Sequence, residues 1–529
     1  MNKEFERSTE RSMPFGMQVL SDLLKGSHEG VDLRHELFVG ARWTWDFLCS
    51  TAMLRLHPRS SRQSGQNPLR QTMYREGCAI PRYKHSFRDY LDHDNLVSQK
   101  LILDVGLPVH WMTIRYLFLK QASLPELYRD FIGLTEPEAY YRDDVVIDQL
   151  FNGFWPLTFA KDTTKTREFY WEQRFDRYDI GGLGELPGFR FQIDFCNDVP
   201  ELKSITFYPR KDQRSDPDPS LIRTPQHAES WELAKRTALG LWHYVGTLHR
   251  HAVGGHLNME QYLIALLRNV RPGNPLYGLL YPHLKGCQGV NLVSLDRVVL
   301  ARKSMYATAG PFTMDSMMAF VTDSIGQYDW KGWRPPPPMG RFHSHANAAN
   351  VYWSILTEYV DRYFQLRADG FVSGWPEIDA FCRELTEHSV RKDDGSPSIS
   401  PISEASHEQK IRDLKEICRY VIYWVTYEHS HLHESVVLPY LYCQTIQEST
   451  EEYERIVGSY EWRKAAVKML FLIRVFREVE EFMRTRKFKS VLRNVDGDIP
   501  ELFLRILIRR KPELDAVGYD ATKLLQIVI

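Results

Sequence analysis

The sequence WELAKRTALGLWHYVGTLHRHAVGGH occupies residues 231–256 and carries the strongest structural signal in the chain. Its apolar residues recur at helical spacing as far as His249, which predicts an amphipathic helix. Three histidines then follow within eight positions: His249, His251 and His256. Imidazole is the commonest metal ligand in proteins, so a histidine cluster on a helix is a candidate metal site.

The spacing of these histidines leaves more than one arrangement open. On a regular α-helix, His251 and His256 lie about 140° apart, and they face together only if the helix contains a π-bulge. Gly254 and Gly255 favour such a distortion, because each glycine costs roughly 1 kcal/mol relative to alanine inside a helix. The same glycines are also typical of a helix end. His249 and His256, seven residues apart, would be nearly eclipsed on a straight helix.

A second cluster, HSHLH, contains His429, His431 and His433. On a helix, His429 and His433 lie about 40° apart and share one face, whereas His431 lies about 200° from His429. The pair able to chelate an ion is therefore His429 and His433. We expect His431 to point away, toward supporting contacts or solvent.

The chain ends in the apolar sequence LLQIVI, with Ile529 as the last residue. If this tail packs inside the protein, its terminal carboxylate needs a cation or a metal beside it, because an unpaired buried charge is very costly. The alternative is a tail on the surface with a solvated carboxylate. Without other observations, the residues favour the surface position.

The stretch 231–291 resembles the metal-binding core of lipoxygenases, which shows W-x-LAK, His-x4-His, a segment like MEPFxIAxxR, then HPxYKLLxPHxR and IN. The matching residues, in order and spacing, are Trp231, Leu233, Ala234, Lys235, His251, His256, Met259, Glu260, Ile264, Ala265, Arg268, Pro275, Tyr277, Leu279, Leu280, Pro282, His283 and Asn291. Residues 143–156, 342–364 and 422–436 resemble further family segments in the expected order.

The resemblance implies a mononuclear non-haem iron, or manganese, as cofactor. Its ligands would be His251, His256, His429, His433 and the carboxylate of Ile529. His283 would be structural in this family. The position linked to the stereochemistry of oxygen addition corresponds to Ser294, and Leu292 and Val298 would line the substrate channel with it. We expect His343 and His345 to lie in a surface loop after the proline run 335–338, with a position lining a channel as the alternative.

The implied activity is a dioxygenase reaction. It abstracts hydrogen from a 1,4-pentadiene of a polyunsaturated fatty acid and inserts O2 to give a hydroperoxide. One alternative keeps the metal core but oxidises or rearranges another polyene metabolite. The other keeps the lipoxygenase shape but is a catalytically silent lipid-binding protein. A zinc hydrolase using the same histidines is disfavoured, because no glutamate stands in a general-base position beside the first pair.

The predicted fold is mainly α-helical, with one large lipoxygenase-type domain over residues 111–529. Residues 1–110 are expected to form a helical extension, either a lid over the substrate entrance or a packing element. Helical periodicity appears in 35–56, 231–249, 350–366, 410–429 and 462–483. Residues 189–195 and 202–209 predict a small β-hairpin. The family's N-terminal lipid-binding β-barrel is not recognisable.

The composition is that of an ordinary globular protein: of 529 residues, 43% are hydrophobic and 26% charged, with a formal net charge of −1. This balance argues against a nucleic-acid partner bound through a basic surface. The seven scattered cysteines, without a CxxC pair, favour a reducing compartment. The sequence shows neither the apolar region of a signal peptide nor an apolar run long enough to span a membrane. We therefore expect a cytoplasmic protein, which could still contact a membrane surface.

Overall fold

The computed structural model describes residues 123–132, 135–161, 168–208 apart from 176, 180–187 and 197–198, then 221–284, 312–435 apart from 393, 450–459 and 499–521. It also describes isolated positions, among them Cys287 and Asn291. The predicted extension 1–110, the helix at 35–56 and most of the helix at 462–483 lie outside these residues. The division of the chain near residue 110 therefore stays a prediction.

Helices make up most of the described chain, which confirms the mainly α-helical prediction. They are α6 (Leu124–Ile132), η3 (Pro137–Tyr141), α7 (Asp143–Asn152), α8 (Ala228–Gly246), η5 (Thr247–Leu257), α9 (Asn258–Asn269), α10 (Pro275–Leu284), α13 (Met314–Ile325), α14 (Ser344–Leu366), α15 (Ala368–Ser373), α16 (Trp375–His388), α17 (His407–Tyr423), η7 (Trp424–Glu428), α18 (His429–Ser435), α19 (Thr450–Gly458) and α22 (Ile499–Ala516). The segments η5 and η7 are π-helical, and η3 is a 3-10 helix.

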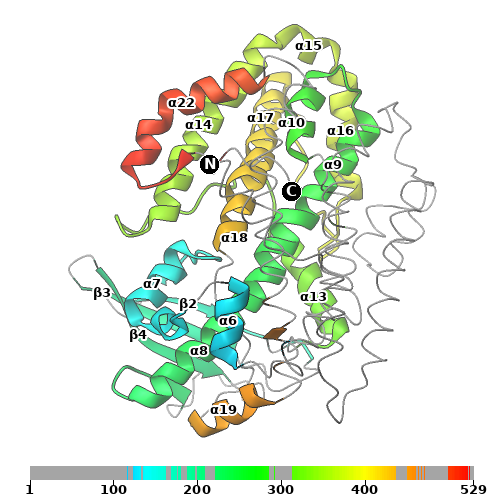
Figure 1. Ribbon diagram of the computed structural model, residues 1–529. Helices are drawn as coiled ribbons and strands as arrows, with labels where there is room; N and C mark the ends of the chain where they lie inside the picture. The colour runs from blue at the N-terminus through cyan, green and yellow to red at the C-terminus, as the bar shows by residue number, and fades with distance from the viewer. Residues whose placement is uncertain are drawn as a thin grey trace, which may run out of the picture.

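A five-stranded antiparallel sheet lies at one side of the molecule (Figure 1). Its strands are β1 (Ala160–Lys161), β2 (Glu168–Gln173), β3 (Gly188–Cys196), β4 (Val199–Tyr208) and β5 (Ile222–Arg223), paired in that order. The pairing of β3 with β4 confirms the predicted hairpin. Alternate residues Phe189, Phe191 and Ile193 are fully buried, as expected for a sheet with one face on the core.

Two long helical rods cross near the middle of the molecule (Figure 1). The first runs from α8 through η5 into α9, and the second from α17 through η7 into α18. The Ser406 hydroxyl caps the second rod by accepting a hydrogen bond from the Gln409 amide at 3.1 Å. The rods contact each other where η5 meets η7 and α18. Both predicted histidine clusters therefore fall at the crossing.

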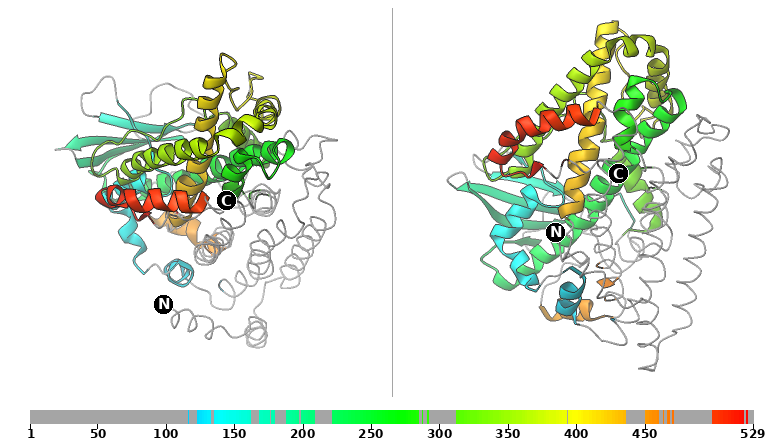
Figure 2. Two further views of the ribbon diagram at one scale, coloured as in Figure 1. Left: turned by 90° about the horizontal axis from the view of Figure 1, so that it is seen from above. Right: turned by 45° about the horizontal axis from the view of Figure 1, so that its top comes forward.

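Other helices surround this crossing. α14 packs against α17, and α22 covers α14 on its outer side (Figures 1 and 2). α13 packs against η5, and α16 against α9. The periodicity analysis did not identify α13, α16 or α22. In α22, the internal Pro512 and a run of charged residues obscure the apolar stripe.

The W-x-LAK motif has a clear structural role in joining α7 to α8. The buried Lys235 ammonium lies 2.7 Å from an Asp143 carboxylate oxygen and 2.7 Å from Glu232. The Trp231 indole donates a hydrogen bond to the same Asp143 oxygen at 3.0 Å. Because Lys235 is buried, these carboxylates compensate its charge, and they fix the start of the first rod.

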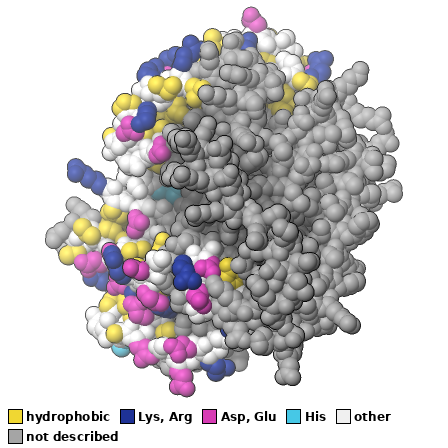
Figure 3. Space-filling model, in the orientation of Figure 1, with side chains coloured by type: hydrophobic (Ala, Val, Ile, Leu, Met, Phe, Trp, Pro, Cys, Tyr) yellow, Lys and Arg dark blue, Asp and Glu magenta, His cyan; other side chains and the backbone are white. Residues whose placement is uncertain are grey.

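None of the described helices is long and apolar enough to cross a bilayer. On the described part of the face shown in Figure 3, basic and acidic side chains are interspersed, in keeping with the near-zero net charge. The cysteines in the part of the chain that is described, Cys196, Cys287, Cys382 and Cys418, are free thiols.

Candidate metal centre

The predicted distortion between His251 and His256 is present as the π-helix η5, which continues directly into α9. Because a π-helical turn holds more residues than an α-helical turn, it brings the two imidazoles to the same side of the rod. A second π-helical segment, η7, ends immediately before His429. Both parts of the candidate centre therefore lie at π-distortions, and the helix does not end at the glycine pair.

The two glycines allow the rods to approach each other. A Cβ atom on Gly254 would lie 2.8 Å from the Trp424 ring and 2.8 Å from the Tyr328 ring. A Cβ atom on Gly255 would lie 3.1 Å from the imidazole of His429. All three distances are shorter than ordinary van der Waals contact, so larger residues would push η5 away from η7 and α18.

Three buried imidazoles converge at this contact. His256 Nε2 lies 3.2 Å from His251 Nε2 and 3.2 Å from His429 Nε2. One ring nitrogen from each residue lies within 4.8 Å of the others. Neighbouring ligands with metal–nitrogen bonds of about 2.1 Å at right angles are about 3 Å apart, so these separations suit nitrogens around a single ion.

The hydrogen-bond partner of His256 determines which nitrogen it presents. Its Nδ1 lies 2.9 Å from Asn291 Oδ1, while Asn291 Nδ2 donates to Glu260 Oε2 at 2.9 Å. The amide orientation therefore makes Oδ1 the acceptor, and His256 Nδ1 carries the proton. Burial lowers the pKa of His256 to about 4, although Asn291 opposes this shift. His256 is thus neutral near pH 7, with a bare Nε2 directed at the other two histidines.

His249, the rival to His251, lies elsewhere. Its ring packs between Trp155 and Tyr328, with centroids 5.6 and 5.2 Å away. The Tyr328 hydroxyl also donates to the His249 carbonyl at 3.0 Å, which satisfies a backbone acceptor within the π-helix. Burial lowers the pKa of His249 to about 3. The tertiary structure therefore selects the pair His251 and His256.

The remaining histidines take other roles. His431 points away from the three imidazoles, as expected, and its Nε2 lies 2.8 Å from the Gly153 carbonyl. His283 is buried in α10 and lies outside the imidazole group. The prediction of a surface loop for His343 and His345 is wrong: both are buried, at 1% and 3% exposure, because they begin α14 where it enters the core.

Several predicted site residues cannot be placed. His433 belongs to α18, but its side chain is outside the described residues. Ile529 and the predicted channel residues Leu292, Ser294 and Val298 also lie outside them. Their roles stay predictions.

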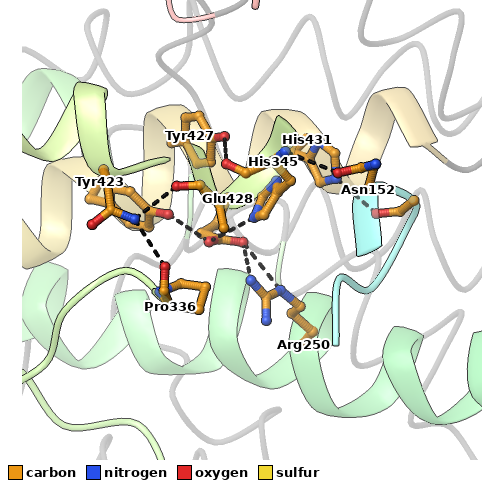
Figure 4. A network of polar contacts seen from close by, with 11 residues as sticks. Asn152, Arg250, Pro336, His345, Tyr423, Tyr427, Glu428 and His431 are labelled. Atoms are coloured by element: carbon orange, nitrogen blue, oxygen red, sulfur yellow. Dashed lines mark hydrogen bonds and ion pairs between the residues drawn. The ribbon is translucent and has the colours of Figure 1, made fainter. Parts of the chain in front are cut away.

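The sequence analysis did not single out Arg250 or Glu428, which form a buried ion pair beside the imidazoles (Figure 4). The only sequence signal for Glu428 was an acidic residue directly before a histidine, after the largely apolar stretch 420–427. Nothing in the sequence paired it with Arg250.

The residues present fit a transition metal. Imidazoles suit iron and zinc, and the described cluster is buried, closely spaced and supplied with an oriented proton on His256.

Comparisons with known proteins point to one family. No family model matches the chain. A linolenate 9R-lipoxygenase of Nostoc sp. is 25% identical over 314 residues, covering 56% of this chain and 37% of the relative. A mouse epidermal-type polyunsaturated fatty acid (12S)/(13S)-lipoxygenase is 27% identical over 241 residues, covering 41% and 33%. A manganese lipoxygenase of Pleurotus sapidus is 25% identical over 173 residues, covering 29% and 26%. The matches thus span about a third of the length of these relatives.

Solved structures agree on the fold. A 9R-lipoxygenase from Cyanothece superposes with a TM-score of 0.68 at 22% identity, over 82% of this chain and 71% of the other. A coral 8R-lipoxygenase superposes with a TM-score of 0.63 at 13% identity, over 82% and 73%. The chain therefore has the fold of these lipoxygenases. Its sequence is similar to curated lipoxygenases over part of its length.

Proposed function

We propose that this protein is a lipoxygenase-type dioxygenase that converts a polyunsaturated fatty acid into a hydroperoxide. The observation that carries the proposal is the convergence of His251, His256 and His429 from two π-helical segments. The curated relatives support it, since their names specify linolenate and other polyunsaturated fatty acids. A pentadiene in another metabolite is the alternative substrate.

We propose non-haem iron as the cofactor, with His433 and the carboxylate of Ile529 completing its ligands. Manganese is the alternative, because one relative is a manganese lipoxygenase. When bound, the metal would supply the one-electron redox chemistry that starts the reaction.

The chain's own residues orient and shield this chemistry. Asn291 keeps the proton on His256 Nδ1, so that the nitrogen facing the ion is bare. The exposed fractions of His251, His256 and His429 are only 8%, 5% and 4%, so little water reaches the centre. Exclusion of water protects a carbon-centred radical from side reactions.

The overall reaction balances without an external reductant. One C–H bond of the carbon between the two double bonds breaks, and O2 forms a bond to one end of the pentadiene. The hydrogen returns to the outer oxygen, so the hydroperoxide contains both oxygen atoms of one O2 and every atom of the substrate.

The test is product analysis with the full chain. The purified protein is incubated under air with linoleic acid, arachidonic acid and a panel of other polyenes, and conjugated-diene absorbance and O2 uptake are followed. Metal content is measured on the same preparation. The matched control is His256→Ala, which we expect to lose the metal and the activity together.

Each outcome distinguishes one candidate function from the others. Iron or manganese with a hydroperoxide product supports the proposal. Bound lipid without O2 uptake on any polyene would favour a silent binding protein. Zinc as the sole metal, with no oxidation, would contradict a dioxygenase.

A further inference from the structure

A buried ion pair links the two rods one residue away from the candidate ligands (Figure 4). Arg250 directly precedes His251 on η5, and Glu428 directly precedes His429 at the end of η7. The guanidinium donates to Glu428 Oε2 from Nε at 3.1 Å and from Nη2 at 2.5 Å. The rods therefore meet at two adjacent levels, one through the imidazoles and one through this pair.

The Glu428 carboxylate is fully buried and has partners on both oxygens. Its Oε1 accepts a hydrogen bond from the Tyr423 hydroxyl at 2.8 Å and lies 3.6 Å from His345 Nε2 on α14. Through the Arg250 guanidinium, the Tyr423 hydroxyl and the His345 imidazole, the carboxylate connects three elements of the core.

The surroundings of Arg250 restrict its movement. Its guanidinium lies 5.7 Å from the centroid of the Trp424 ring, and the same ring lies against Gly254. Any shift of the pair would therefore disturb the packing that lets the rods approach.

A stability role alone does not account for this arrangement. A buried ion pair loses the hydration of both charges, and a well-packed apolar pair of similar size is often equally stable or more so. Here the guanidinium Nε and Nη2 both donate to one carboxylate oxygen, Glu428 Oε2, which gives the pair a defined direction between the two helices. Buried polar pairs of this kind can set the register of the helices that carry them. A slip of one residue along a rod would move an imidazole by about 1.5 Å and rotate it by about 100°, which would destroy its convergence with the others.

We propose that Arg250 and Glu428 form a positioning brace that sets the register of η5 against η7 and α18 and so pre-organises His251, His256 and His429 for the metal. This inference rests on the proposed function, because it presupposes a metal at those histidines. Neither residue contacts substrate in this proposal, and both act through the neighbouring ligands.

The sign of the mutational effect distinguishes positioning from simple electrostatics. Glu428→Gln leaves a buried cation near the metal site, which by charge alone weakens cation binding. Arg250→Met leaves a buried anion, which by charge alone strengthens it. A positioning brace predicts that both variants weaken binding, by about tenfold or more, the size seen when groups that orient metal ligands are removed.

The experiment measures Co2+ affinity of the full chain by competition with a chromogenic chelator, with the visible Co2+ spectrum as a readout of coordination geometry. Circular dichroism and thermal melting confirm folding. We expect Arg250→Met and Glu428→Gln to weaken Co2+ binding and alter the spectrum. The double variant R250M/E428M should recover thermal stability but not affinity, because apolar side chains restore packing without restoring register.

The matched control is the Arg268–Glu384 pair, 2.5 Å apart, which joins α9 to α16 with similarly low exposure. Arg268→Met should lower the melting temperature but leave Co2+ affinity within about twofold of the original.

Two results would overturn the brace: unchanged Co2+ affinity in folded single variants, or opposite shifts in the two. If a single variant does not fold, the double variant decides, and a normal affinity there would overturn the brace. Failure of the unaltered protein to bind Co2+ would instead contradict the metal centre itself, which separates this inference from the proposed function.

Discussion

α18 carries two histidines of different kinds only two residues apart. His429 turns toward His251 and His256, whereas His431 packs on His345 with ring centroids 4.3 Å apart. Burial does not separate these two histidines, because His429 is only 4% exposed and burial also lowers the pKa of His431 to about 3. The two histidines differ in the partners of their ring nitrogens. His431 Nε2 faces the Gly153 carbonyl, which can only accept a hydrogen bond, so that nitrogen carries a proton. A protonated nitrogen cannot bind a metal, and a buried histidine is a ligand candidate only where a bare nitrogen faces the others.

The largest expected effect on metal affinity comes from replacing His429 or His431, one at a time, by glutamine. His429→Gln should weaken metal binding a hundredfold or more, since each ligand of a structural metal site contributes about 3 kcal/mol. His431→Gln should retain the metal, because it changes only the contacts to Gly153 and His345, neither of which belongs to the imidazole group. Chelator competition measures both. Equal losses in the two variants would contradict the distinction.

A pH experiment tests a buried histidine that is not a candidate ligand, His283. Burial lowers the pKa of His283 to about 3, whereas the unfolded value is 6.5. The unfolded chain therefore takes up a proton that the folded protein excludes, and stability present above pH 6.5 is lost as the pH falls. Between pH 6.5 and 4.5 this amounts to roughly 2–3 kcal/mol.

The check is the pH dependence of urea unfolding. His283→Leu should flatten the decline of the unfolding free energy over that interval, whatever its effect at pH 7. An identical slope in both proteins would show that His283 takes up its proton while folded.

The close approach of the rods can be tested at Gly254. Gly254→Ala would place a Cβ atom 2.8 Å from both Trp424 and Tyr328, so we expect a loss of about 1–2 kcal/mol and weaker metal binding. The matched control is Gly273→Ala, where a Cβ atom meets nothing within 4 Å. Thermal melting and metal affinity of both variants provide the comparison, and similar results would exclude a packing role for Gly254.

The smallest effect on metal affinity is expected at Asn291. Asn291→Ala frees His256 to move its proton to the nitrogen that faces the ion, which should lower metal affinity about tenfold. It also removes a hydrogen bond to the buried Glu260, so we expect a loss of about 1–3 kcal/mol of stability. Affinity measured beside thermal stability checks this. A change in stability without a change in affinity would assign Asn291 to packing alone.

Much of the fold could be predicted from local pattern. The helices around 231–249, 350–366 and 410–429 and the hairpin were readable, because helix and strand periods are properties of a short stretch. The strand β2 and the helices α13, α16 and α22 were missed. In α22 the internal Pro512 and the charged residues obscure the period. The candidate site was readable in its residue types and in its need for a π-distortion.

The amino-acid sequence by itself determined which imidazoles could serve, and that a regular helix could not bring His251 and His256 together. Helix geometry left His249 open, the family resemblance favoured His251, and the tertiary structure placed His251 beside His256. Only the tertiary structure buried His343 and His345, gave the glycine pair its packing role and joined Arg250 to Glu428. The physical reason is that periodicity describes one helix at a time. The rotation and register of one helix on another depend on side chains such as Trp424 and Tyr328, which come from distant segments and meet only in the folded protein.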